Sequence, residues 1–253
     1  AKELKQAAVI GAGAMGAGIA LLLARKGVAT RLKDIKPEFV ARGVKTVRDL
    51  LAKDTKRKKL TKRQAEEIFD RLSPGTDYRG LKNADVVIEA VPEKLELKRS
   101  LFAAVEPHVG ARAILATNTS SLSIARISEA VTRPGQVIGL HFFNPVHIMQ
   151  LLEIVVHDGT APVVLQACRE WGAAIGKQCI TVKDFPGFAT SRLGVCLGME
   201  AIRMVEQGVA SAEDIDTAMK LGTNVPMGPL TLADFIGLDT CLAIMRVLHE
   251  GLG

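Results

Sequence analysis

Short apolar runs alternate along the chain with longer segments that have helical periodicity. This alternation is typical of right-handed β-α-β units, so the sequence predicts an α/β domain built on a mostly parallel sheet. Seven runs are predicted as strands, and an eighth strand would fit the same architecture. The seven are Ala7–Ile10, Val28–Lys33, Asp85–Ala90, Ala113–Ala116, Val137–Phe142, Leu151–Val156 and Gln178–Val182.

A polar segment separates the second predicted strand from the third. It reads as two helices, near 37–54 and 61–71, and predicts a helical arm over about residues 36–72. Further along, Pro186 and Gly187 interrupt the pattern, because proline lacks an N–H and glycine frees the backbone.

Beyond this break the apolar strand-like runs stop. Residues 188–208 have helical periodicity, and Ser211 is placed to cap a second helix. Pro226 through Pro229 separate that helix from two more. The sequence therefore predicts an α/β domain over residues 1–184 and a small all-α domain over residues 185–253.

The start of the chain carries a glycine motif in the context of a strand, a turn and a helix. Gly11 would permit the tight turn, Gly13 would leave room for a pyrophosphate, and Gly16 would let the helix pack closely. The pyrophosphate would lie on N–H groups at the helix start. Asp34, after the second strand, would bind both ribose hydroxyls and repel a 2′-phosphate. We therefore predict an NAD-binding Rossmann-type domain, although glycines also occur at turns that bind nothing.

The same segment does not match an export signal. Three glycines interrupt the apolar run, and Arg25 and Lys26 follow it. Too few continuous apolar residues are present to span a bilayer, which needs ~20.

The positive charge is distributed unevenly along the chain. The hydrophobic content of 48% is ordinary for a globular protein, and the net charge of +6 comes largely from one stretch of the predicted arm. That stretch, the basic cluster, comprises Lys53, Lys56, Arg57, Lys58, Lys59, Lys62 and Arg63. It could bind nucleic acid, an anionic membrane surface or a phosphorylated small molecule. Alternatively, it is simply a solvated helix surface. One Trp and one Tyr argue against nucleic acid.

The cysteines suggest a reducing environment. Cys168, Cys179, Cys196 and Cys241 form no CxxC pair and have no histidine at metal-ligand spacing. We expect reduced and mostly buried thiols, in a bacterial cytoplasm or a matrix-like compartment, with no metal site.

His141 and Glu153 are the strongest candidates for chemistry. His141 ends an apolar strand, at the edge where open α/β sheets bind ligands. Glu153 lies in a strand otherwise built for burial, so its carboxylate needs a partner. Bonded to one ring nitrogen, it would fix the tautomer and leave the other nitrogen to take a proton. Alternatively, His141 is structural and Glu153 faces water from an edge strand.

Other polar residues follow predicted strands at the same edge. The segment 118–121, Asn-Thr-Ser-Ser, could bond a substrate carbonyl or the nicotinamide ribose, or simply cap the next helix. Glu93 and Lys98 come after the strand that ends at Ala90, and they could equally lie on a helix surface.

Nine segments match one family in the correct order: GAGAMGAGIA at 11–20, Asp34, VPE at 91–93, NTSSL at 118–122, HFFNPV at 141–146, LLEI at 151–154, DFPGF at 184–188, EDIDTAMKLG at 213–222 and PMGPLTLADFIGLD at 226–239. Over essentially its whole length the chain thus resembles the L-3-hydroxyacyl-CoA dehydrogenases of fatty-acid β-oxidation, either stand-alone or as part of a multifunctional α-subunit. The resemblance implies NAD-dependent oxidation of L-3-hydroxyacyl-CoA to 3-ketoacyl-CoA.

The resemblance also implies roles for single residues. His141 would be the base, Glu153 would orient it, and Ser120 and Asn144 would complete the catalytic set. Ser120, Asn144 and Ser191 would contact substrate. Cofactor contacts would be Gly11, Ala12, Gly13, Met15, Gly16, Asp34, Val91, Glu93, Lys98, Ser120 and Asn144. The arm would meet the CoA moiety, and the helical domain would close over the acyl chain and, as in stand-alone relatives, form dimer contacts. The resemblance thus implies a homodimer or a part of a larger β-oxidation polypeptide or complex.

The chain departs from the family pattern in two places. Ser191 stands where many relatives have Asn, and relatives continue for several dozen residues beyond the motif at 226–239, which predicts a truncated helical domain. Two alternatives to the main prediction remain. One is a 3-hydroxybutyryl-CoA dehydrogenase working reductively, and the other is a non-catalytic NAD-binding relative.

Overall fold

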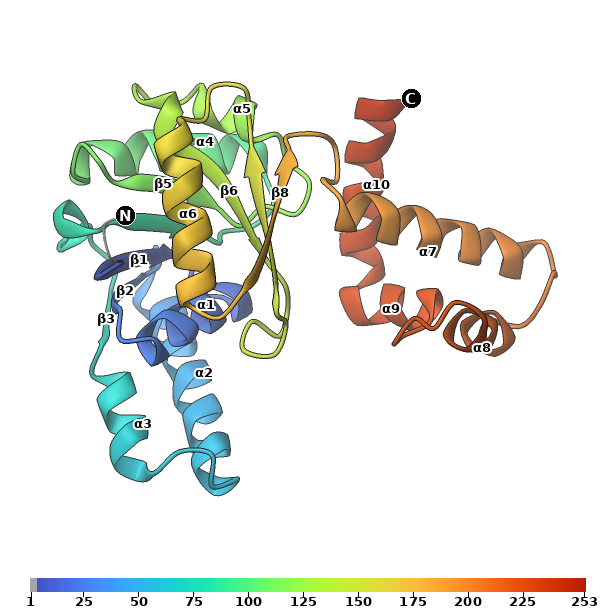
Figure 1. The fold of residues 1–253 in the computed structure, drawn as a ribbon, viewed down its shortest axis with the longest axis horizontal. Coiled ribbons are helices and arrows are strands. Elements are labelled where there is room, and N and C mark those ends of the chain that lie inside the picture. The colour runs from blue at the N-terminus through green and yellow to red at the C-terminus, as the bar shows by residue number, and fades with distance from the viewer. Residues whose placement is uncertain (1–3) are drawn as a thin grey trace. The chain divides into compact units, whose positions relative to one another are not determined.

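One sheet of eight strands forms the core of the computed structural model, which describes residues 4–253. The strand order is β3-β2-β1-β4-β5-β6-β7-β8 (Figure 1). The strands are β1 (Gln6–Ile10), β2 (Ala29–Lys33), β3 (Leu72–Gly75), β4 (Val86–Glu89), β5 (Ile114–Thr117), β6 (Val137–Phe142), β7 (Leu151–Val156) and β8 (Gln178–Lys183).

The pairing is parallel throughout except between β6 and β7, which run antiparallel. From β1 the chain passes to β2 on one side and later returns to β4 on the other. Such a reversal opens a crevice at the carboxyl ends of the strands, where open α/β sheets bind their ligands. The predicted α/β fold class is confirmed.

The chain consists of two compact units. The first unit holds the sheet and comprises the described residues up to Thr119 together with Ile124–Asp184. Its helices are α1 (Ala14–Arg25), α2 (Pro37–Lys56), α3 (Lys62–Phe69), α4 (Leu95–Val105), α5 (Ile124–Ser128) and α6 (Pro162–Ala174). The pair α2 and α3 extends away from the sheet (Figure 1).

The core of this unit forms where helices cover the strands. Helix α1 buries nine of its twelve residues, including Ile19 and Leu23, against strand residues such as Val9 and Leu32. A helix that is apolar on nearly all sides belongs inside a protein rather than on its surface. The glycine turn that begins α1 is thereby fixed to the middle of the sheet.

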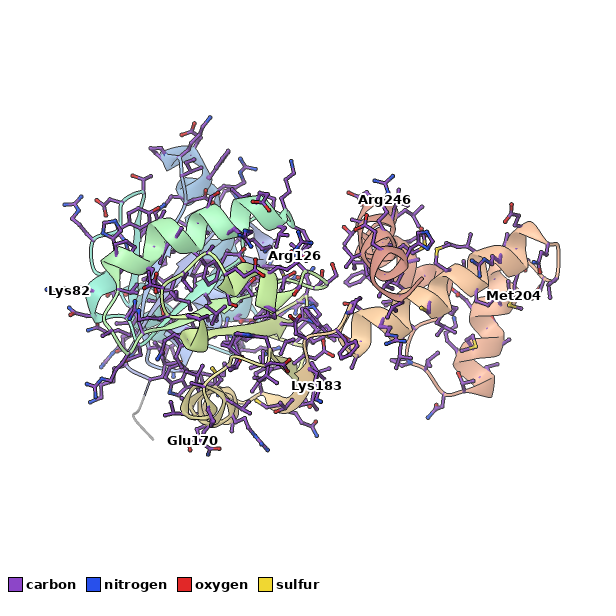
Figure 2. The ribbon with its side chains drawn as sticks, turned by 90° about the horizontal axis from the view of Figure 1, so that it is seen from above. Lys82, Arg126, Glu170, Lys183, Met204 and Arg246 are labelled. Carbon is purple, nitrogen blue, oxygen red and sulfur yellow. The ribbon has the colours of Figure 1, made fainter. Side chains whose placement is uncertain are left out.

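The second unit comprises Ser120–Ser123 and Phe185–Gly253. It is helical, with α7 (Thr190–Glu206), α8 (Ala212–Gly222), α9 (Pro229–Ile236) and α10 (Leu238–Leu252). Val195, Ile244 and Leu248 form its buried centre. Figure 2 adds the side chains, with Met204 of α7 and Arg246 of α10 labelled in this unit. As predicted, Ser211 caps α8, since its hydroxyl accepts from Asp214 N at 3.1 Å.

Three sequence expectations need correction. The strand β3 was not among the seven predicted runs, and the second arm helix ends at Phe69 rather than residue 71. The cysteines are less buried than expected: Cys168 is buried, Cys179 and Cys241 are partly exposed, and Cys196 is exposed. All four are free thiols. Burial raises the pKa of the Cys168 thiol.

Within residues 4–253, no helix is both long enough and apolar enough to cross a bilayer. In the same range, no group of three or more His, Cys, Asp or Glu side chains is arranged to hold a metal ion.

Asp216 joins two helices of the second unit. Its buried carboxylate accepts from Leu230 N at 2.8 Å, Thr231 N at 2.9 Å and the Thr231 hydroxyl at 2.5 Å, which satisfies the start of α9. Gly228 makes room, since a Cβ there would come within 2.3 Å of the carboxyl carbon. Burial acts to raise the pKa of Asp216, but the hydrogen bonds from Thr231 and Leu230 outweigh it and lower the pKa.

Replacing Asp216 with Asn is expected to lower the free energy of unfolding of the helical unit by about 1–2 kcal/mol at neutral pH, because charged acceptors are lost. The folded-state pKa lies below the unfolded value, so this stabilisation is present above about pH 4 and is lost as the pH falls through the folded pKa. Urea melts at pH 7 and pH 3 measure the effect. A gap between wild type and variant that persists undiminished at pH 3 contradicts the assignment.

Candidate active site

The turn from β1 to α1 has the backbone geometry of a phosphate cradle. Gly11 has a φ of +102°, and a Cβ there would lie 2.4 Å from the Ala90 carbonyl oxygen. A Cβ on Gly16 would lie 1.7 Å from the Gly11 oxygen. The fold itself therefore requires these two glycines, because backbone oxygens lie too close to leave room for a side chain at either position.

Gly13 differs from the other two. It stands at the N-cap of α1 with an ordinary φ of −69°, and a Cβ there would meet nothing within 4 Å. No side chain caps this helix. The fold leaves open space at the positive end of α1, which is where a pyrophosphate group is stabilised. The residues present therefore fit a dinucleotide.

Asp34 has a contact that the sequence did not indicate. One carboxylate oxygen accepts from Ala12 N at 2.6 Å and the other from Ile35 N at 2.6 Å. The acid predicted to bind ribose thus also holds the glycine turn in place.

His141 and Glu153 lie opposite each other on the antiparallel pair β6 and β7. His141 Nδ1 is 2.7 Å from Glu153 Oε2, and the two residues are 7% and 0% exposed. A carboxylate only accepts, so Nδ1 carries the proton and Nε2 holds the ring's lone pair in the neutral imidazole. The alternative that Glu153 faces water is excluded, because its side chain is fully buried.

Two contacts next to the histidine hold the end of β6. The Phe143 ring packs against the His141 ring with centroids 4.4 Å apart. Phe142 N donates to Asn118 Oδ1 at 2.9 Å, and Asn118 N donates to the Glu89 carbonyl at 2.8 Å. The Asn118 side chain therefore supports the histidine strand.

Lys98 does not lie on a helix surface, which was one of its two interpretations. It is 1% exposed, and its Nζ lies 2.7 Å and 3.0 Å from the Glu89 carboxylate oxygens and 3.2 Å from Glu93. Glu89 itself was missed by the sequence analysis. The signal was available, because Glu89 is a charged residue in an apolar strand, as Glu153 is.

The other predicted site residues are distributed over both units. Met15, in the first turn of α1, and Val91, after β4, are partly buried, and Asn144 is exposed after β6. Ser120 and Ser191 belong to the second unit. The cofactor and substrate contacts assigned to these five residues stay predictions.

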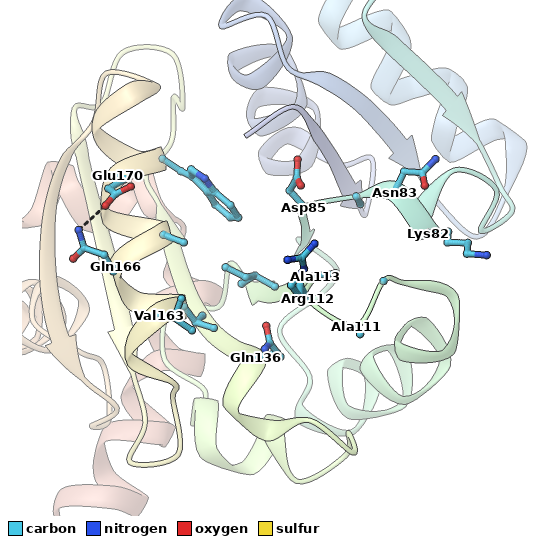
Figure 3. Close-up of a pocket in the computed structure, with 16 residues that line it drawn as sticks. Lys82, Asn83, Asp85, Ala111, Arg112, Ala113, Gln136, Val163, Gln166 and Glu170 are labelled. Atoms are coloured by element: carbon cyan, nitrogen blue, oxygen red, sulfur yellow. Dashed lines mark hydrogen bonds between the residues drawn. The ribbon is translucent and has the colours of Figure 1, made fainter. Parts of the chain in front are cut away.

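The first unit also has a cavity of about 720 Å³, and none of the predicted site residues lines it (Figure 3). It is lined by Asp85, Ala113 and Gln136, which directly precede β4, β5 and β6, and by one side of α6. These positions are at the amino ends of the parallel strands. Ligands of open α/β sheets bind at the opposite edge, so the carboxyl-edge residues remain the candidate site.

Comparison with known proteins identifies the class. A family described as "3-hydroxyacyl-CoA dehydrogenase, NAD binding domain" matches residues 6–185, and its C-terminal domain matches residues 187–253. The chain belongs to the 3-hydroxyacyl-CoA dehydrogenase family. The predictions of an NAD-dependent dehydrogenase and of NAD as its cofactor are confirmed.

Individual relatives cover nearly the whole chain. A probable 3-hydroxybutyryl-CoA dehydrogenase of Bacillus subtilis is 43% identical over 99% of this chain and 88% of its own length. The human mitochondrial hydroxyacyl-coenzyme A dehydrogenase is 40% identical over 98% of this chain and 81% of its own. The crystal structure of (S)-3-hydroxybutyryl-CoA dehydrogenase PaaH1 from Ralstonia eutropha has a TM-score of 0.93 and 40% identity, covering 98% and 88%.

Gly13→Ala is expected to fold normally and to bind NADH at least tenfold more weakly. Its methyl group would meet no protein atom but would enter the space for the pyrophosphate. Thermal melting and a titration of NADH fluorescence measure the two properties. Gly11→Ala is the comparison: we expect it to lose about 1–3 kcal/mol of stability, because φ is positive and the Ala90 oxygen is too close. Wild-type NADH affinity in Gly13→Ala would contradict the cradle.

Proposed function

We propose that this enzyme interconverts L-3-hydroxyacyl-CoA and 3-ketoacyl-CoA, with His141 as the general base and Glu153 as the residue that orients it. The bond between His141 Nδ1 and the buried Glu153 carboxylate is the observation that supports the proposal. It fixes the tautomer in which Nε2 can accept a proton.

Proton transfer is the step assigned to the chain's own residues. In the oxidative direction, His141 Nε2 takes the proton of the 3-hydroxyl group, and Glu153 stabilises the imidazolium that results. NAD, when bound, supplies the acceptor for the hydride that leaves C3. In the reductive direction the imidazolium returns the proton to the developing alkoxide. Because Glu153 is fully buried, water does not weaken its attraction to the charged ring.

Substrate positioning is assigned to residues near the ends of β5 and β6. Asn144 lies two residues after the histidine strand, and Ser120 follows β5, so both fit contacts to the reacting groups. Ser191 would contact substrate from α7. Its hydroxyl is shorter than the asparagine amide of many relatives.

The CoA moiety is assigned to the arm formed by α2 and α3. All seven side chains of the basic cluster are exposed, and CoA carries several phosphate oxygens. A cluster of exposed cations would strengthen binding of such a ligand without contributing to the chemistry.

Two metabolic settings fit this activity. Fatty-acid β-oxidation, alone or within a multifunctional polypeptide, uses the oxidative direction, as predicted from the sequence. A short-chain pathway would use the reductive direction, and the Bacillus subtilis and Bradyrhizobium diazoefficiens relatives, at 43% and 42% identity, are named for 3-hydroxybutyryl-CoA. The ratio of kcat/KM for C4 and C16 substrates separates the two: a preference for C4 supports the second setting.

His141→Gln is expected to lower kcat for the reduction of acetoacetyl-CoA by ~10²–10⁴, because a positioned base is lost. Glu153→Gln should act in the same direction but less strongly, since its amide oxygen still accepts from Nδ1–H. Loss of NADH absorbance at 340 nm follows the rate.

His108→Gln is the matched control for that experiment. His108 is exposed and stacks on Tyr78, at the opposite edge of the sheet from His141, so its replacement should leave kcat unchanged. NADH affinity should be retained in all three variants. A His141→Gln rate within a few-fold of wild type would overturn the assignment of the base and favour the non-catalytic alternative.

Charge reversal in the arm tests the CoA contact. The double variant Lys59→Glu/Lys62→Glu should raise KM for acetoacetyl-CoA about five- to tenfold, and more at low salt, while kcat is retained. KM for acetoacetyl-pantetheine, which lacks the nucleotide phosphates, should not change. Lys82→Glu, an exposed lysine outside the arm, is the control. Equal effects on both substrates would place the CoA phosphates elsewhere.

A further inference from the structure

Glu89 and Lys98 form a buried ion pair that the proposed proton transfer does not use. Both are 1% exposed, and Lys98 Nζ contacts both carboxylate oxygens of Glu89. Replacing a buried ion pair by apolar residues of similar volume is often neutral or stabilising. Stability alone is therefore a weak reason for such a pair, and its contacts indicate what else it does.

The pair sits at the centre of a polar network that joins β4, β5 and α4. Glu89 accepts from Val91 N at 2.6 Å and from the Thr117 hydroxyl at 2.6 Å. Thr119 N donates to that hydroxyl oxygen at 3.3 Å. Lys98 also reaches the Val91 carbonyl at 3.3 Å. Both the turn after β4 and the segment after β5 are thus fixed to one carboxylate.

The network includes Glu93, whose side chain is partly exposed. One Glu93 oxygen lies 3.2 Å from Lys98 Nζ, and the other accepts from the Thr119 hydroxyl. The Glu93 side chain is 31% exposed, whereas Lys98 and Thr119 are each 1% exposed. The buried groups therefore fix the direction of a carboxylate at the carboxyl edge of the sheet.

The same network borders both halves of the candidate active site. Ala90 N, between Glu89 and Val91, donates to the Ile10 carbonyl at 2.7 Å. The Ala90 carbonyl oxygen is the atom that lies too close to Gly11 for a Cβ there. On the other side, the Glu89 carbonyl accepts from Asn118 N, and the Asn118 side chain accepts from Phe142 N of β6, next to His141. A shift of the turn after β4 would consequently disturb the glycine cradle directly.

We infer that Glu89, with Lys98 and Thr117, positions the cofactor-binding edge of this enzyme: the buried pair holds the Ala90–Glu93 turn against the glycine cradle and sets the orientation of Glu93. Only the kcat measurements that test this inference rest on the proposed function. Replacing residues that position the cofactor should weaken NADH binding. The pH dependence of kcat, which reports on His141 and Glu153, should not change.

Thr117→Val tests the inference with little disturbance of volume. It removes one donor to Glu89 and the acceptor of Thr119 N, so Kd and KM for NADH should rise about tenfold. The kcat at saturating NADH should stay within about threefold of wild type, and the pH dependence of kcat should not move. Thr117→Ser, which restores the hydroxyl, should return the NADH affinity to within about twofold of wild type.

Thr30→Val is the matched control. Thr30 is a buried threonine of β2 whose hydroxyl donates only to the local Val28 carbonyl at 3.0 Å. Both valine variants should melt at similar temperatures, but only Thr117→Val should weaken NADH binding. In the cofactor-free protein, the amides of Val91 and Thr119 should exchange with deuterium faster in Thr117→Val than in Thr30→Val.

Several outcomes would overturn the inference. These are a Thr117→Val Kd within twofold of wild type, an equal rise in Thr30→Val, or no recovery in Thr117→Ser. The NADH titrations and amide exchange need no acyl-CoA. A wild-type protein that binds NADH but does not reduce acetoacetyl-CoA would therefore refute the proposed function while the positioning inference is still decided by Kd.

Discussion

A carboxylate with no access to water, in contact with an imidazole, is the interaction on which the candidate site depends. Glu153 lies between Leu152 and Ile154, which are 1% and 0% exposed, so its charge has no solvent to stabilise it. The partner is supplied by register: β7 runs antiparallel to β6 and places His141 directly opposite. A slip of one residue would set His141 against an aliphatic side chain and turn Glu153 to the other face of the sheet.

Two strands of this sheet carry a buried carboxylate, and the two have different partners. Glu153 contacts an imidazole, which can accept and release a proton, whereas Glu89 contacts the ammonium group of a lysine. The first pair suits a proton acceptor. The second suits a fixed charge that holds loops in place. One physical rule, that a buried charge needs a partner, thus accounts for both halves of the site.

The sequence predicted the parts of the fold that are continuous in the chain. The bounds of β6 and β7 were predicted to the residue, because each is a mostly apolar run between polar segments. The edge strand β3 was missed because Leu72-Ser-Pro-Gly75 has one buried side chain and a proline, which the pattern of a strand does not include.

Contacts between distant segments could not be predicted in the same way. Lys98 lies in an amphipathic stretch that resembles a surface helix, and its burial follows only once Glu89, in a neighbouring strand, is in place. The pairing of His141 with Glu153 was predicted because the two strands are adjacent in the chain and the carboxylate stands out among apolar residues. Glu89 stands out equally, but its partner is a lysine on a helix, and no periodicity connects the two.

Asp34 shows how recognition and shape are coupled in the cradle. A carboxylate has about four acceptor positions, and Asp34 uses one on each oxygen for the Ala12 and Ile35 amides. The remaining positions suffice for ribose hydroxyls, so the same side chain that is predicted to bind the ribose also keeps the glycine turn in its binding shape before the cofactor arrives. A substitution at Asp34 made to admit a 2′-phosphate therefore also removes the acceptor of the Ala12 amide. A change of cofactor preference at this position consequently needs a second change that holds the turn.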